Sequence, residues 1–155
     1  MATGNDLGGS LRIPASFNGV VGLRPGPGVV ARGKRLQPFD SLWVEGPMGR
    51  SVADVALMLD AQAGHDLGDP FSFPSPERSY SETVNSSGCP KRIAFSRDLG
   101  VVHVSKQIAG IAETSVLRLR DAGIEVTGEI PDFNGVLEAF QVLRAILLGT
   151  MMGPL

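Results

Sequence analysis

The residues best suited to chemistry stand at the beginning of the chain, where Ser10 directly follows two glycines. Asp6 lies four residues before this serine, and Arg12 lies two residues after it. Glycine lets backbone approach a ligand closely because it has no Cβ. The consecutive amides of such a loop can point toward a developing negative charge, as an oxyanion hole requires. Pro14 suits the first turn of a short helix whose positive end would face the same place.

Simpler interpretations of this loop exist. A serine beside glycine usually hydrogen-bonds its own backbone in a turn, and composition alone favours that role for Ser10. A phosphate-binding loop would need a Gly-Lys-Ser/Thr ending and a full preceding strand, and the sequence has no such ending here. The residues by themselves therefore predict a turn that faces an anion and carries a serine.

A longer stretch gives the loop a context, since residues 3–25 read TGNDLGGSLRIPASFNGVVGLRP. This run resembles the second half of the amidase signature, the Gly/Ser-rich motif of the amidase signature family, whose members cleave carboxamides with a Ser–Ser–Lys triad. The likeness continues through Gly46, Pro47, Met48, Arg50, Ser51, Val52, Asp54 and Ala56, and then through Asp66 and the Asp69-Pro70 pair.

The resemblance implies a role for each residue of the loop. Ser10 would be the nucleophile that attacks the carboxamide. The oxyanion hole would be formed by the backbone amides of Leu7, Gly8, Gly9 and Ser10. Asp6 and Arg12 would brace the loop. The resemblance implies no metal and no cofactor.

The base of the resembled triad is missing from these residues. A serine hydroxyl is a weak nucleophile until a base removes its proton. In the family, this base is a neutral lysine that acts through a second serine held in a cis peptide, and both lie N-terminal of the Gly-Gly-Ser loop. We therefore expect residues 1–155 to be a partial amidase-signature domain that lacks the N-terminal Lys/Ser portion and a C-terminal remainder. Such a chain is expected to be inactive by itself.

No other side chain of the sequence replaces that base. A lysine becomes a useful base only when burial lowers its pKa to roughly 7–8. Nothing around Lys34, Lys91 or Lys106 predicts burial. His65 and His103 lie in loop-like sequence and match no family position, and no Cys/His/Asp spacing indicates a metal site.

Hydrophobic patterns predict the elements that would hold the loop. Short strands are expected over residues 17–24 and 41–47, and a helix is expected from Ser51 to Gly64 with Asp54 completing its capping box. For the three basic residues within 31–37, a solvated loop is favoured over a carboxylate-binding patch. Residues 65–90 form a Pro/Ser-rich connector with no apolar period. It could be a domain linker, but a surface excursion inside one domain is preferred.

The rest of the chain alternates strands and helices. Strands are predicted over residues 92–95 and 124–126, a helix between Ser105 and Gly123, and a last helix capped by Asp132. This alternation predicts the α/β class, and the resemblance implies part of a mixed β-sheet core covered by helices. The segments on both sides of residues 65–90 are expected to be halves of one sheet.

Composition limits the partners and the compartment. The net charge of −2 provides no footprint for nucleic acid or for an anionic membrane. The single Cys89 cannot form an internal disulfide, and no targeting signal is visible, so a cytoplasmic protein is expected. The expected partners are a small-molecule amide and either a complementing N-terminal chain or further copies of this chain.

Three functions remain open at this point. The first is an amidase segment that hydrolyses carboxamides once it is complemented. The second is a non-catalytic remnant or interaction module. The third is a relative of the amidotransferase A subunit that acts on mischarged tRNA, against which stand Ile13, where that subunit commonly has glutamine, and the lack of a basic surface.

Overall fold

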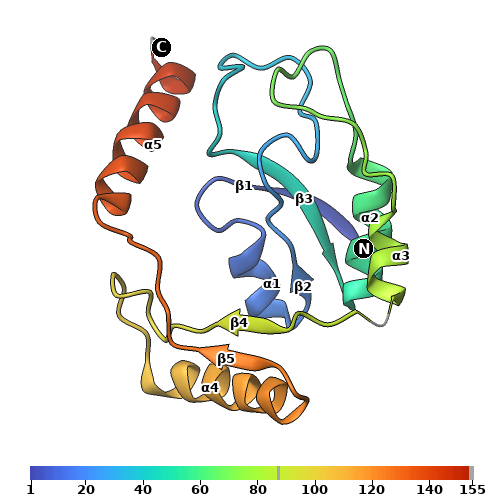
Figure 1. Cartoon of the computed structure of the whole chain (residues 1–155). Helices are drawn as coiled ribbons and strands as arrows, with labels where there is room; N and C mark the ends of the chain where they lie inside the picture. Colours follow the sequence, from blue (N-terminus) through green and yellow to red (C-terminus); the bar gives the residue numbers. More distant parts are fainter. Residues whose placement is uncertain (87, 154–155) are drawn as a thin grey trace. The chain divides into compact units, whose positions relative to one another are not determined.

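The structure is a computed structural model that describes residues 1–86 and 88–153. Its elements form two compact units, which we describe one at a time (Figure 1). Unit 1 comprises Met1–Ser86 and Gln141–Leu155, and unit 2 comprises Ser87–Phe140.

Unit 1 is built on a three-stranded antiparallel sheet with the strand order β1-β3-β2. Its strands are β1 (Ala2–Asp6), β2 (Val21–Gly22) and β3 (Val44–Gly49). In the register of β1 and β3, Asp6 lies opposite Val44 and Ala2 lies opposite Met48. The carboxyl end of β1 therefore places Asp6 and the loop after it beside the first residue of β3.

Helix α1 (Arg12–Asn18) follows the loop and contains Pro14 in its first turn, as predicted. It ends at Gly19, which has a φ of 62° and needs no side chain in that left-handed conformation. The strand predicted over residues 17–24 is therefore wrong in extent, because Phe17 and Asn18 complete the helix and only β2 is extended.

Helix α2 (Val52–Gln62) confirms the prediction from sequence. The hydroxyl of Ser51 accepts a hydrogen bond from the Asp54 amide at 3.1 Å, and the Asp54 carboxylate accepts one from the Ser51 amide at 3.1 Å. This reciprocal pair satisfies amides that the first helical turn leaves without partners. Val55 and Leu59 are buried on one face of the helix.

Residues 65–90 are not wholly irregular, because they contain helix α3 (Tyr80–Asn85). A capping box between Ser79 and Glu82 begins it. The Asp60 carboxylate of α2 also accepts hydrogen bonds from the amides of Tyr80 and Ser81, at 2.6 and 3.0 Å. A carboxylate twenty residues away thus stabilises the first turn of α3, a short helix that the absence of an apolar period did not predict.

Helix α5 (Val136–Met152) begins later than predicted. Asp132 does not cap it; its carboxylate accepts a hydrogen bond from the Asn134 amide at 2.9 Å, ahead of the helix. In unit 1, Leu147 is buried and the Gln37 side chain donates to the Thr150 hydroxyl. The described residues contain no helix that is both long and apolar enough to cross a membrane.

Unit 2 is a β-α-β segment made of β4 (Arg92–Ala94), α4 (Lys106–Asp121) and β5 (Glu125–Thr127), and both strands were predicted within a residue or two. Ser105 caps α4 as predicted, and the helix ends just before Gly123. The strands β4 and β5 pair in parallel as a sheet of their own. The expectation of one sheet shared by both halves is therefore wrong for the described residues, whereas the single partial domain over 1–155 stays a prediction.

Candidate active-site loop

The Gly-Gly-Ser loop joins β1 to α1 (Figure 1). Ser10 is exposed, while its neighbours Gly9 and Leu11 are buried. Gly9 has a φ of 116°, and a Cβ at this position would lie 2.7 Å from Cδ1 of Ile13. Only glycine fits both conditions, so the turn that presents Ser10 depends on Gly9.

The carboxylate of Asp6 holds the loop together from inside. Its Oδ1 accepts a hydrogen bond from the Gly9 amide at 2.6 Å, and its Oδ2 accepts one from the Leu11 amide at 3.3 Å. Arg12 adds a two-pronged contact, with Nε at 2.9 Å from Oδ2 and Nη2 at 3.1 Å from Oδ1. The structure thus brings Asp6 and Arg12 together. Asp6 also accepts hydrogen bonds from the backbone amides on both sides of Ser10.

Asp6 is fully buried and stays ionised at neutral pH. Burial by itself would raise its pKa, but the hydrogen bonds from Arg12 and from the Gly9 and Leu11 amides outweigh it and lower the pKa from 3.8 to about 2. The same hydrogen bond with Asp6 raises the pKa of Arg12. The loop is therefore stabilised by a permanent ion pair.

Of the four amides predicted to form the oxyanion hole, the Gly9 amide already donates a hydrogen bond to Asp6. The Gly9 N–H points at Asp6, so it cannot point fully at an incoming oxyanion. The N–H groups of Leu7, Gly8 and Ser10 donate to no acceptor within residues 1–86 and 88–153. These three amides stay candidates for the predicted oxyanion hole.

Arg24 is a residue of this site that we did not assign from the sequence. Its Nε lies 3.6 Å from Oδ1 of Asp6, and its Nη2 donates to the Leu42 carbonyl at 2.7 Å. The available signal was the Arg24-Pro25 pair that closes the run resembling the amidase signature.

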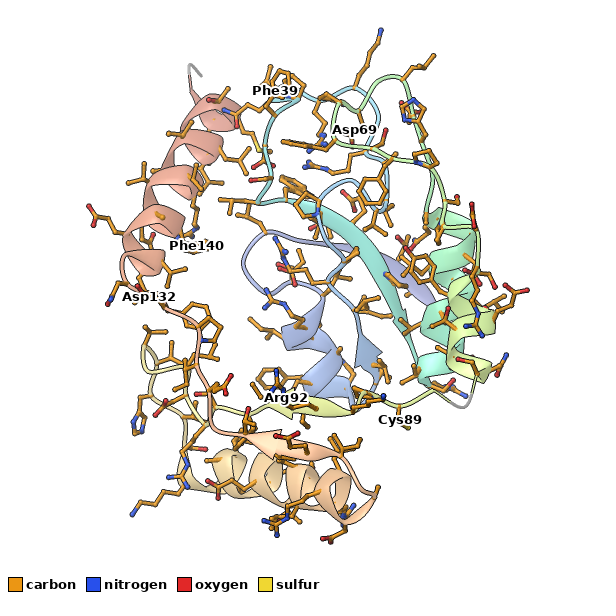
Figure 2. All side chains as sticks on the ribbon, viewed as in Figure 1. Phe39, Asp69, Cys89, Arg92, Asp132 and Phe140 are labelled. Carbon is orange, nitrogen blue, oxygen red and sulfur yellow. The ribbon has the colours of Figure 1, made fainter. Side chains whose placement is uncertain are left out.

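The basic stretch at residues 31–37 is not a solvated loop. The side chain of Arg35 is 8% exposed and pairs at 2.6 Å with buried Asp69, which Figure 2 labels. Arg32 pairs with Asp40 at 3.2 Å and lies over the Trp43 ring. The favoured prediction is thus wrong for both arginines, because their carboxylate partners come from other parts of the chain.

Asp69 repeats the pattern of Asp6 at a second place in unit 1. Burial would raise its pKa, but the amides of Arg32 and Phe71 and the guanidinium of Arg35 lower it overall. The Arg32 amide lies 2.9 Å from Oδ2, and the Phe71 amide lies 3.0 Å from Oδ1. This second ion pair fixes the loop between β2 and β3.

The other candidate bases lack the surroundings that a catalytic base needs. The side chains of Lys34, Lys91 and Lys106 are exposed, so they lack the burial that a neutral lysine needs. His65 contacts the Ser72 hydroxyl at 3.0 Å, but that hydroxyl also bonds the carbonyls of Asp66 and Asp69 as part of a turn.

Unit 1 also contains an apolar cleft of about 370 Å³. Residues 36–42 line one side of it, and Leu143 and Ile146 of α5 line the other. Leu42, whose carbonyl binds Arg24, is one of the lining residues.

Taken together, the fold and the loop define a mixed α/β segment that presents an exposed serine beside three available amides. Comparison with known proteins identifies the family. The family model described as Amidase matches residues 1–147, and the chain belongs to this amidase signature family.

Individual relatives match almost the whole chain. The acylamidase of Rhodococcus erythropolis is 35% identical over 139 residues, which is 90% of this chain and 29% of that protein. The A subunit of the glutamyl-tRNA(Gln) amidotransferase of Azorhizobium caulinodans is 40% identical over 125 residues, which is 81% of this chain and 25% of that protein.

Solved structures agree with the fold. A bacterial aryl acylamidase of the amidase signature family superposes with a TM-score of 0.83 and 26% identity, over 97% of this chain and 32% of its own. The peptide amidase of Stenotrophomonas maltophilia superposes with a TM-score of 0.74 and 33% identity, over 95% and 30%. The chain spans about a third or less of the length of these relatives.

Proposed function

We propose that residues 1–155 are the nucleophile-bearing segment of an amidase that cleaves the C–N bond of a small carboxamide. The observation that carries this proposal is the loop held by Asp6, which exposes Ser10 next to amides that have no partner among the described residues. Membership of the amidase family supports the same chemistry.

In the proposed reaction, Oγ of Ser10 attacks the carbonyl carbon as its proton passes to a base. The amides of Leu7, Gly8 and Ser10 stabilise the oxyanion. The C–N bond then breaks, the proton goes to the departing amine, and an acyl ester remains on Ser10. A water molecule attacks this ester, releases the carboxylic acid and restores the serine.

The base is proposed to come from polypeptide outside residues 1–155. Within those residues the lysines are exposed, and the resembled triad uses a lysine and a second serine that precede this loop. The complement would be an N-terminal polypeptide or another copy of the chain. The 155-residue chain by itself is then expected not to turn over amides.

A second candidate is the role of an amidotransferase A subunit, in which the amide nitrogen is transferred to glutamyl-tRNA(Gln) rather than lost. The observation in its favour is the 40% identity with the Azorhizobium caulinodans protein. Ile13 and the net charge of −2 favour the hydrolase instead. Once the chain is complemented, turnover of an aryl acylamide would support the hydrolase, and release of ammonia from glutamine alone would support the transferase.

The experiment that tests the proposal is labelling with a serine-directed fluorophosphonate. It compares the wild-type chain with Ser10→Ala and with Ser16→Ala, an exposed serine of α1 that serves as the matched control. Each chain is tested alone and with the N-terminal part of the Rhodococcus erythropolis acylamidase that precedes its matching region. We expect labelling of the complemented wild type and Ser16→Ala chains, and none of Ser10→Ala.

Other results would overturn specific parts of the proposal. Labelling of the complemented chain that survives Ser10→Ala would exclude Ser10 as the nucleophile. Labelling of the lone chain that requires Ser10 would show that a base lies within residues 1–155. An unlabelled chain in every mixture would favour the non-catalytic module.

A further inference from the structure

Arg24 lies between two segments that are far apart in the sequence. Its Nη2 donates to the Leu42 carbonyl at 2.7 Å, and its Nε lies 3.6 Å from Oδ1 of Asp6. The side chain of Arg24 is 26% exposed, compared with 55% for Arg12. Arg24 is therefore the less solvated of the two cations beside Asp6, and water screens its charge less.

Close backbone packing sets the position of Arg24. The Leu23 amide donates to the Pro47 carbonyl at 3.1 Å, which extends the pairing of β2 with β3 by one residue. A Cβ on Gly46 would lie 2.5 Å from the Leu23 carbonyl oxygen and 2.7 Å from Cδ of Pro25. The residues on both sides of Arg24 thus pack directly against Gly46 of β3.

The anchor at Leu42 is equally well held. The carboxylate of Asp40 accepts hydrogen bonds from the amides of Leu42 and Trp43, at 3.0 and 3.2 Å. Arg32 binds the same carboxylate at 3.2 Å and the Trp43 carbonyl at 2.6 Å. The Leu42 carbonyl is therefore presented to Arg24 by a loop that its own ion pairs stabilise.

We propose that Arg24 is a positioning residue for Ser10. It contacts both the Asp6 carboxylate and the Leu42 carbonyl of the next loop. The same carboxylate accepts hydrogen bonds from the Gly9 and Leu11 amides, on both sides of Ser10. Arg12 alone leaves Asp6 with one partly solvated cation, whereas Arg24 adds a second from the interior of unit 1. The link also connects the serine loop to the rim of the apolar cleft, because Leu42 lines that cleft. The consequence for catalysis rests on the proposed function of Ser10; the effect on Asp6 does not.

The test measures Asp6 and its two amides rather than activity. The titration of the Asp6 carboxyl carbon and the hydrogen exchange of the Gly9 and Leu11 amides are followed by NMR in the full 155-residue chain. The variants are Arg24→Met, which removes the charge, and Arg24→Lys, which keeps it. Arg97→Met, in the exposed Arg97–Glu113 pair of unit 2, is the control with the same change in net charge.

We expect Arg24→Met to raise the pKa of Asp6 above its wild-type value and to speed exchange of both amides about fivefold, the factor expected for a partly buried ion pair. Exchange of the Leu59 amide in α2 should not change. Arg24→Lys should restore part of the pKa shift, and Arg97→Met should behave like wild type.

Wild-type values for both the Asp6 pKa and the two exchange rates in Arg24→Met would overturn the role of Arg24. If Arg24→Met does not fold, Arg24→Lys decides: a lysine cannot hold Leu42 and Asp6 together, so wild-type exchange of the Gly9 and Leu11 amides in that variant would equally overturn it. Failure of Ser10 labelling with an intact effect on Asp6 would instead remove only the proposed function.

Discussion

The two units of this chain differ in what they bury. Unit 1 buries two carboxylates, Asp6 and Asp69, each inside a set of arginine and amide donors, along with an apolar core around Leu11. In unit 2, the buried apolar residues of the described chain are Ala109 and Ile124. Its ion pair, Arg97 with Glu113, lies at the surface.

This difference shows which unit can hold a buried carboxylate in a fixed position. A carboxylate leaves water only when hydrogen bonds and cations replace its hydration, and such partners must be held by well-packed backbone. Unit 1 supplies that backbone through its sheet, whereas unit 2 has two strands of three residues and one helix whose outer apolar side chains, such as Ile108 and Ile111, are exposed. The candidate site belongs to unit 1 for this reason.

The largest contrast should come from removing one charge in each unit. We expect Asp6→Asn to lower the free energy of unfolding by about 2–3 kcal/mol, because it leaves two arginines and two backbone amides with a neutral partner in a buried place. Glu113→Gln, in the exposed pair, should change it by less than about 0.5 kcal/mol. Urea denaturation at pH 7, followed by far-UV circular dichroism, measures both. Equal costs would contradict the contrast between the units.

The ion pair of Asp6 should also affect how the free energy of unfolding changes at acidic pH. Its pKa is about 2 in the folded chain against an ordinary 3.8, so its contribution is complete above about pH 4 and is lost as the pH falls through 2. The shift corresponds to about 2 kcal/mol. The difference in unfolding free energy between wild type and Asp6→Asn should therefore shrink by about that amount from pH 5 to pH 2. A difference that stays constant over this range would mean that the carboxylate is not stabilised in the folded state.

Two glycine substitutions should act in opposite directions. Gly46→Ala would push a methyl group to within 2.5 Å of the Leu23 carbonyl oxygen, so we expect a loss of about 1–3 kcal/mol. Gly110 lies inside α4, and the methyl group that alanine adds there would meet nothing within 4 Å, so Gly110→Ala should stabilise the chain by about 0.5–1 kcal/mol. Thermal denaturation would give the two signs. A stabilising Gly46→Ala would show that the β3 contact with residues 23–25 is loose.

The helix caps provide the smallest contrast. Ser51 shares two hydrogen bonds of 3.1 Å with Asp54, whereas the Ser105 hydroxyl accepts one at 3.4 Å from Ile108. Ser51→Ala should cost about 1 kcal/mol and Ser105→Ala about 0.5 kcal/mol in urea denaturation. A larger cost for Ser105→Ala would reverse the order that these distances predict.

Local structure was predictable wherever the signals act over a few residues. Helices α2 and α4 follow from a capping serine, a helical apolar spacing and a glycine at the end. Helix α3 was not predictable in this way, because its first turn binds Asp60 of α2. The late start of α5 was missed because Asp132 caps a turn rather than the helix.

The family and the serine loop were predictable without any knowledge of contacts, because residues 3–25 match the amidase signature over a long run. The resemblance to the family also implied that Asp6 and Arg12 brace the loop, and the two side chains are hydrogen-bonded in the structure. The contacts of the other charged side chains could not be predicted from the sequence, because their partners lie far away along the chain. Arg35 meets Asp69 across 34 residues, where Gly28 and Gly68 let the two loops lie close to each other. Arg24 reaches Leu42 across 18 residues, where Gly46 lets Leu23 and Pro25 lie against β3.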